Sequence, residues 1–357
     1  QGKAQTVVFK RLGKGGKEVW IQASFTSVLQ REKVVRVIKF LSAPNKPNTT
    51  GIPKNHPTAL QAAALCKNDL VTRMVFEFPE LQGLMGEHYA RLSGHSDDVA
   101  TAIAQHYQPT QAGGAIPSTQ AGQLLALADK LDTICGIFVA GLKPTASKDP
   151  FALRRASLGV LRILIEGGLG FNVPQLVAQA CENLPKTANS NLQGEITTYI
   201  LERLRGYYAE QGVRGEMLDS VLAMGITTPL DIHHRIQAVQ QFMTLPMAAQ
   251  LTAAHKRVRN LLKSVQIGDF APEINEIYFE HDAEKVLYLA IQNTQKALSS
   301  TSYIHRLQAL ATLQAPVDAF FDAVMVNSDI PVVRMNRLGI LKILDTMCRS
   351  VADISLL

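Results

Sequence analysis

The sequence lacks the features that define several classes of protein. It contains no run of about 18 or more apolar residues, the length that a membrane-spanning helix needs, so we predict no membrane span. It begins with Gln1 and shows no basic and apolar leader, so we expect no secretory signal and treat the chain as a fragment or a processed product. The cysteines form no CxxC pair and have no histidine at zinc-finger spacing, which predicts reduced, mostly buried thiols of an intracellular protein. They are Cys66, Cys135, Cys181 and Cys348.

Charge is scarce and unevenly distributed. Only 18% of the 357 residues are charged and 46% are hydrophobic, which excludes a disordered chain, a collagen-like chain and a bare coiled coil. The net charge of +6 comes from residues 1–54, with 11 Lys and Arg against 2 Asp and Glu, whereas residues 55–245 carry −3 and residues 246–357 are neutral. A polyanionic partner is compatible with this distribution, but bulk charge alone does not establish one.

Hydrophobic periodicity predicts an all-α, multi-domain fold with one small β element at the front. Residues 6–9 and 19–21 flank a Gly-rich, lysine-bearing stretch at 13–17 and predict a hairpin. Ser96 and Asp149 are expected N-caps. Helices are predicted at 58–76, 118–135, 151–166, 192–210, 229–243, 247–264, 282–298, 303–313, 316–327 and 331–350. No repeat of fixed period is present, which argues against a solenoid.

Few motifs in the sequence indicate a catalytic or ligand-binding site. The Lys14–Lys17 stretch departs from a phosphate-binding loop because Glu18 stands where Ser or Thr is needed, so we interpret it as a solvated turn. Spacing assigns no Ser/His/Asp or Cys/His catalytic arrangement. The basic clusters at 233–235 and 255–259 fit either a solvated helix face or phosphate contact, and the sequence leaves both open.

Three carboxylates follow the chain order of the metal site in HD phosphohydrolases, an all-α family that uses a His, a His-Asp doublet and a later Asp. They are Asp69, Asp129 and Asp132. Asn68 stands in place of the doublet histidine, while His56 lies in a Pro-rich linker and His88 on another predicted helix. Because so few ligands remain, we expect a helical scaffold without the metal, and a metal-dependent nucleotide phosphohydrolase is the alternative function.

Seven stretches of the sequence are more specific for one protein family than the overall composition is. They are Met74–Gly86 with Tyr89 and Ala90, Leu127–Asp132, Lys143–Thr145, Asp149–Glu166, Pro316–Val326, Arg334–Leu338 and Val351–Leu357. Together, in this order, they resemble the β subunit of bacterial-type glycyl-tRNA synthetase over about residues 58–357.

The resemblance implies four segments. They are a basic leading segment with the hairpin and a linker at 1–54, a degenerate HD-like domain at 55–170, a helical body at 171–245, and an anticodon-binding helical bundle similar to that of arginyl-tRNA synthetases at 246–357. The chain matches the C-terminal half of a β subunit. The Lys-rich hairpin within 10–24 departs from the family pattern, so its role stays open.

The resemblance also implies an activity and its partners. The enzyme would be a glycine–tRNA ligase of two α and two β chains, in which this chain binds tRNA(Gly) and its anticodon. The α chain would hold glycine, ATP and Mg²⁺. This chain would carry no cofactor and would not aminoacylate alone. The implied location is cytoplasmic, with an organelle as the alternative.

We expect basic and polar side chains of the helices to contact the tRNA. Expected anticodon-side contacts are Arg334, Asn336, Arg337 and Lys342. Expected backbone contacts are Arg154, Arg155, Lys256, Arg257 and Arg259. As the alternative, Arg334 or Arg337 pairs with Asp318 or Asp322 of the preceding helix. A third class, a helical interaction protein without a tRNA role, would lack the salt-dependent RNA affinity that phosphate contacts produce.

Overall fold

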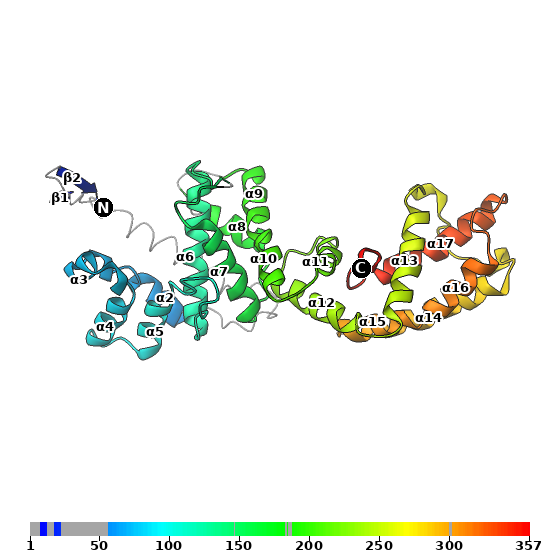
Figure 1. Ribbon diagram of the computed structural model, residues 1–357, viewed down its shortest axis with the longest axis horizontal. Helices are drawn as coiled ribbons and strands as arrows, with labels where there is room; N and C mark the ends of the chain where they lie inside the picture. Colours follow the sequence, from blue (N-terminus) through cyan, green and yellow to red (C-terminus); the bar gives the residue numbers. More distant parts are fainter. Residues whose placement is uncertain are drawn as a thin grey trace. The chain divides into compact units, whose positions relative to one another are not determined.

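The computed structural model describes residues 8–12, 18–22, 56–145, 147–182, 184, 188–299 and 302–357 (Figure 1). These residues are mainly helical, as predicted. Strand β1 (Val8–Leu12) pairs antiparallel with β2 (Glu18–Gln22). The turn predicted at 13–17 lies outside the described residues. Within the described part of the chain, no helix is both long and apolar enough to cross a membrane.

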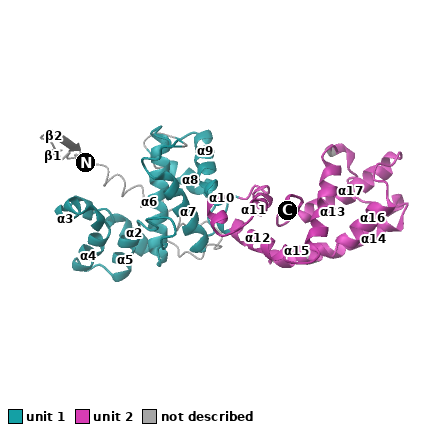
Figure 2. Cartoon of the chain, in the orientation of Figure 1, with its two compact units in different colours: residues 1–204, 227–230 teal, residues 205–226, 231–357 magenta. Residues whose placement is uncertain are grey.

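The chain divides into two compact units (Figure 2). Unit 1 is residues 1–204 with 227–230, and unit 2 is residues 205–226 with 231–357. The helical elements of unit 1 are α2 (Pro57–Leu65), η1 (Asp69–Val71), α3 (Arg73–Glu77), η2 (Pro79–Leu81), α4 (Leu84–Leu92), α5 (Asp97–Gln105), α6 (Gln120–Val139), α7 (Leu153–Glu166), α8 (Val173–Glu182) and α9 (Ser190–Leu201). Two helices, α10 (Arg203–Glu210) and α12 (Pro229–Phe242), contribute residues to both units.

Unit 1 is built around α6. This helix is apolar on most of its circumference, and it packs against α2, α5, α7, α8 and α9. Leu124, Leu127 and Leu131 are fully buried along it. A helix that is apolar on most sides is shielded from water only at the centre of a bundle, which explains the position of α6. At its start, the Thr119 hydroxyl accepts a hydrogen bond from the amide of Gly122 at 3.1 Å.

Two of the predicted helices are interrupted. The helix predicted at 58–76 ends at Leu65, and the one predicted at 192–210 is split at Glu202 into α9 and α10. The sequence conceals the second break because Ile200 and Leu204, four residues apart, are both buried and continue the helical period across it. The first break follows from Asp69, whose buried carboxylate binds amides of a later turn.

The predicted caps are confirmed at Ser96 and revised at Asp149. The Ser96 hydroxyl accepts a hydrogen bond from the amide of Val99. The carboxylate of Asp149 accepts hydrogen bonds from the amides of Leu153 and Arg154 at 2.8 and 2.9 Å, so α7 begins two residues later than predicted. The intervening Ala152 adopts a left-handed conformation with φ of 53°, which reverses the chain into the helix.

Unit 2 holds the last part of the chain. Its elements are α11 (Gly215–Leu222), α13 (Ala248–Leu262), η3 (Ile267–Asp269), η4 (Glu276–Tyr278), α14 (Asp282–Ala297), α15 (Tyr303–Ala311), α16 (Gln314–Ala323), α17 (Pro331–Cys348) and η5 (Ile354–Leu356). The predicted helices of this region agree with the observed ones to within a few residues. The guanidinium of Arg235 donates to the carbonyls of Ser350 and Val351, which ties the C-terminal segment to α12. All four cysteines are buried and none forms a disulfide, as predicted.

Candidate nucleic-acid interface

The carboxylates that suggested a metal site surround an ammonium group instead. The Lys67 side chain is almost fully buried in unit 1, and its Nζ lies 2.7 Å from Nε2 of His106 and 3.0 Å from Oδ1 of Asp129. Nδ1 of His106 lies 2.6 Å from the carbonyl of Ile103, which fixes the proton on Nδ1 and makes Nε2 the acceptor. Nζ of Lys67 also lies 4.2 Å from the ring centroid of Tyr107.

The charges of this cluster are set by burial and by the neighbours. Burial opposes a charge on Lys67, yet the Asp129 carboxylate outweighs it and holds the pKa of the ammonium above its usual value. Burial and then the Lys67 charge lower the pKa of His106 to about 3, so the imidazole is neutral at pH 7. Burial lowers the pKa of Lys130 to about 8. The cluster therefore holds one compensated ion pair and a neutral imidazole.

This donor set does not fit a metal ion. Among the described residues, no group of three or more His, Cys, Asp or Glu side chains is arranged to hold one. His56 caps α2, with its Nδ1 accepting from the amide of Ala59, and His88 is exposed on α4. The ammonium of Lys67 occupies the space between imidazole and carboxylate where a cation would bind. The alternative of a metal-dependent phosphohydrolase is not favoured.

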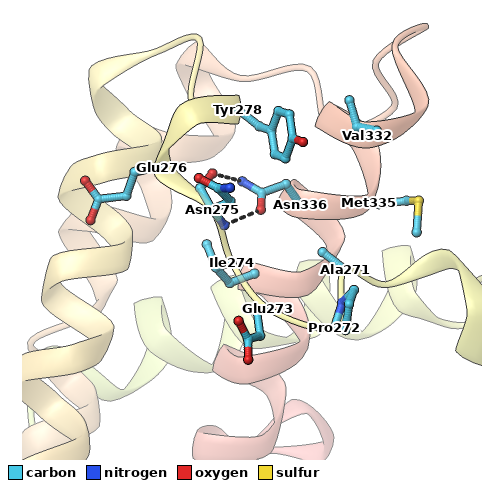
Figure 3. Close-up of a pocket in the computed structure, with 10 residues that line it drawn as sticks. All are labelled: Ala271, Pro272, Glu273, Ile274, Asn275, Glu276, Tyr278, Val332, Met335 and Asn336. Atoms are coloured by element: carbon cyan, nitrogen blue, oxygen red, sulfur yellow. Dashed lines mark hydrogen bonds between the residues drawn. The ribbon is translucent and has the colours of Figure 1, made fainter.

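In unit 2, two adjacent residues of α17 hold the segment that leads into α14. The amide of Asn336 accepts from the backbone N–H of Asn275 at 2.9 Å and donates to the carbonyl of the same residue at 3.2 Å (Figure 3). The Arg337 guanidinium donates to Glu284 at 2.9 Å and to Glu280 at 2.7 Å. Residues 275 and 280 are therefore both fixed to α17, on either side of the exposed residues 276–278.

The Arg337 ion pair is buried and strong. Arg337 is 2% exposed and Glu284 is fully buried. Burial alone raises the pKa of the Glu284 carboxyl, but the hydrogen bonds from Arg337 and from two backbone amides outweigh it and hold that pKa below its usual value. The partners are Glu280 and Glu284, not the Asp318 or Asp322 that we expected as the alternative. In this arrangement neither Asn336 nor Arg337 faces solvent, which favours a positioning role over direct contact with RNA.

A pocket of about 720 Å³ opens between this segment and the start of α17 (Figure 3). Its lining includes Asn275 and Tyr278 from this segment and Val332, Met335 and Asn336 from α17, and Tyr278 lies beside the Asn275–Asn336 pair. Tyr278 and Val332 are exposed, so the aromatic ring is accessible to a flat partner. Sequence reasoning missed Asn275 and Tyr278, because the partner of Asn275 is 61 residues away and a turn-rich segment shows no hydrophobic period.

The other predicted contacts of unit 2 fall into two groups. Arg334, Lys342, Lys256 and Arg257 are exposed. The guanidinium of Arg257 lies 4.2 Å from the ring centroid of Phe321, and Nζ of Lys342 lies 5.8 Å from that of Phe270.

Arg259 is half-buried. It lies 3.6 Å from a carboxylate oxygen of Asp345 and 3.5 Å from one of Asp353, while His255 lies 3.0 Å from Asp345. Of the basic cluster at 255–259, His255 is buried, Arg259 is half-buried against the two carboxylates, and Lys256 and Arg257 are exposed.

The two predicted contacts of unit 1 differ in the same way. Nη2 of Arg154 donates to the carbonyl of Thr145 at 2.6 Å, which braces the turn before α7. Arg155 is exposed. The predicted cations of unit 2 lie on α13 and α17, whereas Arg154 and Arg155 belong to unit 1.

Two family models match separate parts of the chain. Residues 10–223 match the family model described as glycyl-tRNA synthetase beta subunit, and residues 251–354 match the one described as DALR anticodon binding domain. Similar curated proteins are named glycine–tRNA ligase beta subunit. The one from Methylobacillus flagellatus is 47% identical over 305 residues, 83% of this chain and 42% of its own length.

Two further relatives cover more of the chain. The protein of the same name from Pseudomonas syringae pv. tomato is 43% identical over 346 residues, 96% of this chain and 50% of its own length. That from Xanthomonas campestris pv. campestris is 40% identical over 354 residues, with the same two shares. The chain spans about half the length of the curated relatives that it matches.

Proposed function

The chain belongs to the family of glycyl-tRNA synthetase β subunits, and from this membership we propose that it binds tRNA(Gly) and positions it for glycylation by a companion chain. Its contribution to the reaction is orientation. Binding holds the acceptor end of the tRNA in the active site of the other chain, so the entropic cost of bringing the reactants together is met before the chemical step. Glycine, ATP and Mg²⁺ bind to the α chain, two α and two β chains assemble, and the enzyme works in the cytoplasm.

The pocket beside α17 is the observation that carries the anticodon-binding part of this proposal. Unstacked RNA bases bind to proteins by stacking on aromatic side chains and by hydrogen bonds to their edges. Tyr278 offers an exposed ring, Met335 an apolar side chain and Asn275 an exposed polar side chain in the same pocket. The pocket lies within the residues that match the anticodon-binding model.

The exposed cations supply the contacts that are independent of sequence. Arg334, Lys342, Lys256 and Arg257 in unit 2, with Arg155 in unit 1, contact phosphates of the tRNA. The remaining predicted residues act by positioning. Asn336 and Arg337 hold the Tyr278 segment, Arg259 supports α13 from within, and Arg154 braces the turn that presents Arg155.

The finer domain assignment is also part of this proposal. Residues 55–170 form a degenerate HD-like domain, residues 171–245 a helical body and residues 246–357 the anticodon-binding bundle, behind a basic leading segment with a hairpin at 1–54. The Lys67 ammonium between His106 and Asp129 supports an HD-like scaffold that has lost its metal. The chain then contributes binding and no hydrolysis.

The test is a base-resolved binding measurement. A tRNA(Gly) carrying 2-aminopurine at one anticodon position at a time is titrated with the chain, and fluorescence quenching reports stacking. We expect quenching at one position, retained in Tyr278→Phe. Tyr278→Ala should remove it and weaken binding roughly 5- to 150-fold, the value of one stacked base. Val286→Ala, an exposed apolar residue of α14 outside the pocket, is the control. Unchanged quenching in Tyr278→Ala contradicts base binding at this pocket.

A further inference from the structure

The segment after α2 in unit 1 exposes an unusual number of large apolar side chains. Six of them, between 38% and 71% exposed, fall within 15 residues: on η1, on α3, at the residue between α3 and η2, and at the first residue of α4. They are Leu70, Val71, Met74, Phe76, Phe78 and Leu84. These elements contact one another, so the side chains form one local surface, which we call the 70–84 surface. Clusters of exposed apolar side chains of this kind mark sites of protein–protein interaction.

The backbone beneath the 70–84 surface is fixed. The carboxylate of Asp69, itself fully buried, accepts hydrogen bonds from the amides of Gly83 at 2.6 Å and Gly86 at 3.1 Å, which closes the segment into a loop. Within it, the Thr72 hydroxyl donates to the carbonyl of Asp69 and accepts from the amide of Val75. A surface held in one conformation loses little entropy on binding. The apolar side chains are therefore displayed on a rigid loop.

The charges of the 70–84 surface argue against RNA. Its exposed charged residues are one cation, Arg73, and two anions, Glu77 and Glu80. Nucleic-acid affinity comes mainly from cations that neutralise phosphates, and this surface has a net negative charge. Lys67, the nearest lysine in the sequence, is buried and paired with Asp129. An apolar protein surface with a basic rim is the complementary partner.

We propose that the 70–84 surface is the docking site for the α chain of the ligase, which presents an apolar patch bordered by Lys or Arg. This inference rests on the proposed function, because a β subunit implies a companion chain. It adds the location of the contact, on the unit that does not contain the anticodon-binding match. The anticodon-binding pocket and the contact with the companion chain then lie on different units of the chain.

The test uses acidic substitutions at exposed positions. The dissociation constant of the chain for the separately purified α chain is measured for the wild type, Val71→Asp and Leu84→Asp. Leu84 is the first residue of α4, where an acidic side chain favours the helix dipole, so folding should be preserved. Each change should weaken α binding about tenfold or more, since a buried Val or Leu contributes that much. Leu142→Asp, equally exposed elsewhere in unit 1, should have no effect.

The outcomes distinguish this proposal from the proposed function. In the same variants, affinity for tRNA(Gly) should stay within twofold of the wild type and thermal melting should be unchanged. Unchanged α affinity in Val71→Asp and Leu84→Asp overturns the docking site, and so does a wild-type chain that does not bind the α chain. Loss of tRNA affinity or of self-association in place of α affinity assigns the surface to RNA or to a second copy. Failure of the wild type to bind tRNA while α binding persists contradicts the proposed function alone.

Discussion

Nζ of Lys67 lies 2.7 Å from Nε2 of His106, inside unit 1 and beyond the reach of solvent. A lysine ammonium with an imidazole on one side and the Asp129 carboxylate on the other performs the structural task of a bound cation. It neutralises the carboxylate and joins three separate parts of the chain. The Lys67–Asp129 pair therefore holds this part of unit 1 together by the charge of a side chain.

Removing the Lys67 charge should destabilise unit 1. Lys67→Met leaves the Asp129 carboxylate buried without its counter-ion, and breaking a buried pair in this way costs about 3–5 kcal/mol. The free energy of unfolding, measured by urea titration, should fall by that amount. Adding Asp129→Leu to Lys67→Met should restore part of the loss, because an apolar pair needs no counter-ion. A loss below about 1 kcal/mol in Lys67→Met would show that the pair contributes little.

Stability should fall as the solution becomes acidic, with His106 as a main cause. Its pKa is about 3 in the folded protein and 6.5 when exposed, so between these values the unfolded chain binds a proton that the folded chain does not. The free energy of unfolding therefore decreases as pH falls through 6.5, by up to about 1.4 kcal/mol per pH unit. Urea titrations at pH 7.5, 6 and 5 should show a shallower dependence in His106→Gln, which still accepts a hydrogen bond from Lys67. Equal slopes in the two proteins would contradict the assignment.

Arg334 and Arg337 lie three residues apart on α17, but the same substitution should affect different properties at the two positions. Replacing Arg337 should lower stability, whereas replacing Arg334 should weaken tRNA binding. Arg337→Met leaves Glu284 buried without its main partner and should cost about 3–5 kcal/mol of stability. Arg334→Met, at an exposed position, should change stability by less than about 0.5 kcal/mol. In tRNA binding, Arg334→Met should reduce the slope of log affinity against log salt by about one. An unchanged salt slope in Arg334→Met would remove it from the phosphate contacts.

Gly83 should tolerate no side chain. Its φ is 82°, and a Cβ there would lie 2.9 Å from the ring of Tyr107, so Gly83→Ala meets both backbone strain and a clash. Gly94 has a similar φ of 79° but open space around it. Gly94→Ala should cost about 1–2 kcal/mol from strain alone, and Gly83→Ala clearly more, with weaker α binding as the loop of the 70–84 surface opens. Equal melting temperatures for the two variants would show that the Tyr107 contact is unimportant.

The helices were predictable because their information is local. The central α6 shows an apolar run, Ser96 an N-cap and Gly167 a C-terminal stop, and each feature acts within a few residues. The break after Leu65 was not predictable, because it depends on Asp69 binding amides 14 and 17 residues further along the chain. The hydrophobic periodicity of the sequence does not reveal such a long-range contact.

The candidate site was only partly predictable for the same reason. The sequence indicates that α17 carries several polar and basic residues, and Arg334 and Lys342 are exposed on it. It does not indicate which face of α17 is covered, and the covering segment contributes Asn275 and Glu280 to pair with Asn336 and Arg337. Two residues expected to contact RNA thus hold the segment that bears Tyr278. Cations at adjacent positions on a helix had to be separated by burial, which is a tertiary property.

Binding of the chain to tRNA(Gly), compared with the same tRNA carrying altered anticodon bases across a salt series, tests the central claim most directly. We expect affinity to weaken steeply with salt for both RNAs, and the altered anticodon to cost about 1–3 kcal/mol at every salt concentration. Equal affinity for the two RNAs, or affinity that does not depend on salt, would contradict anticodon binding by this chain.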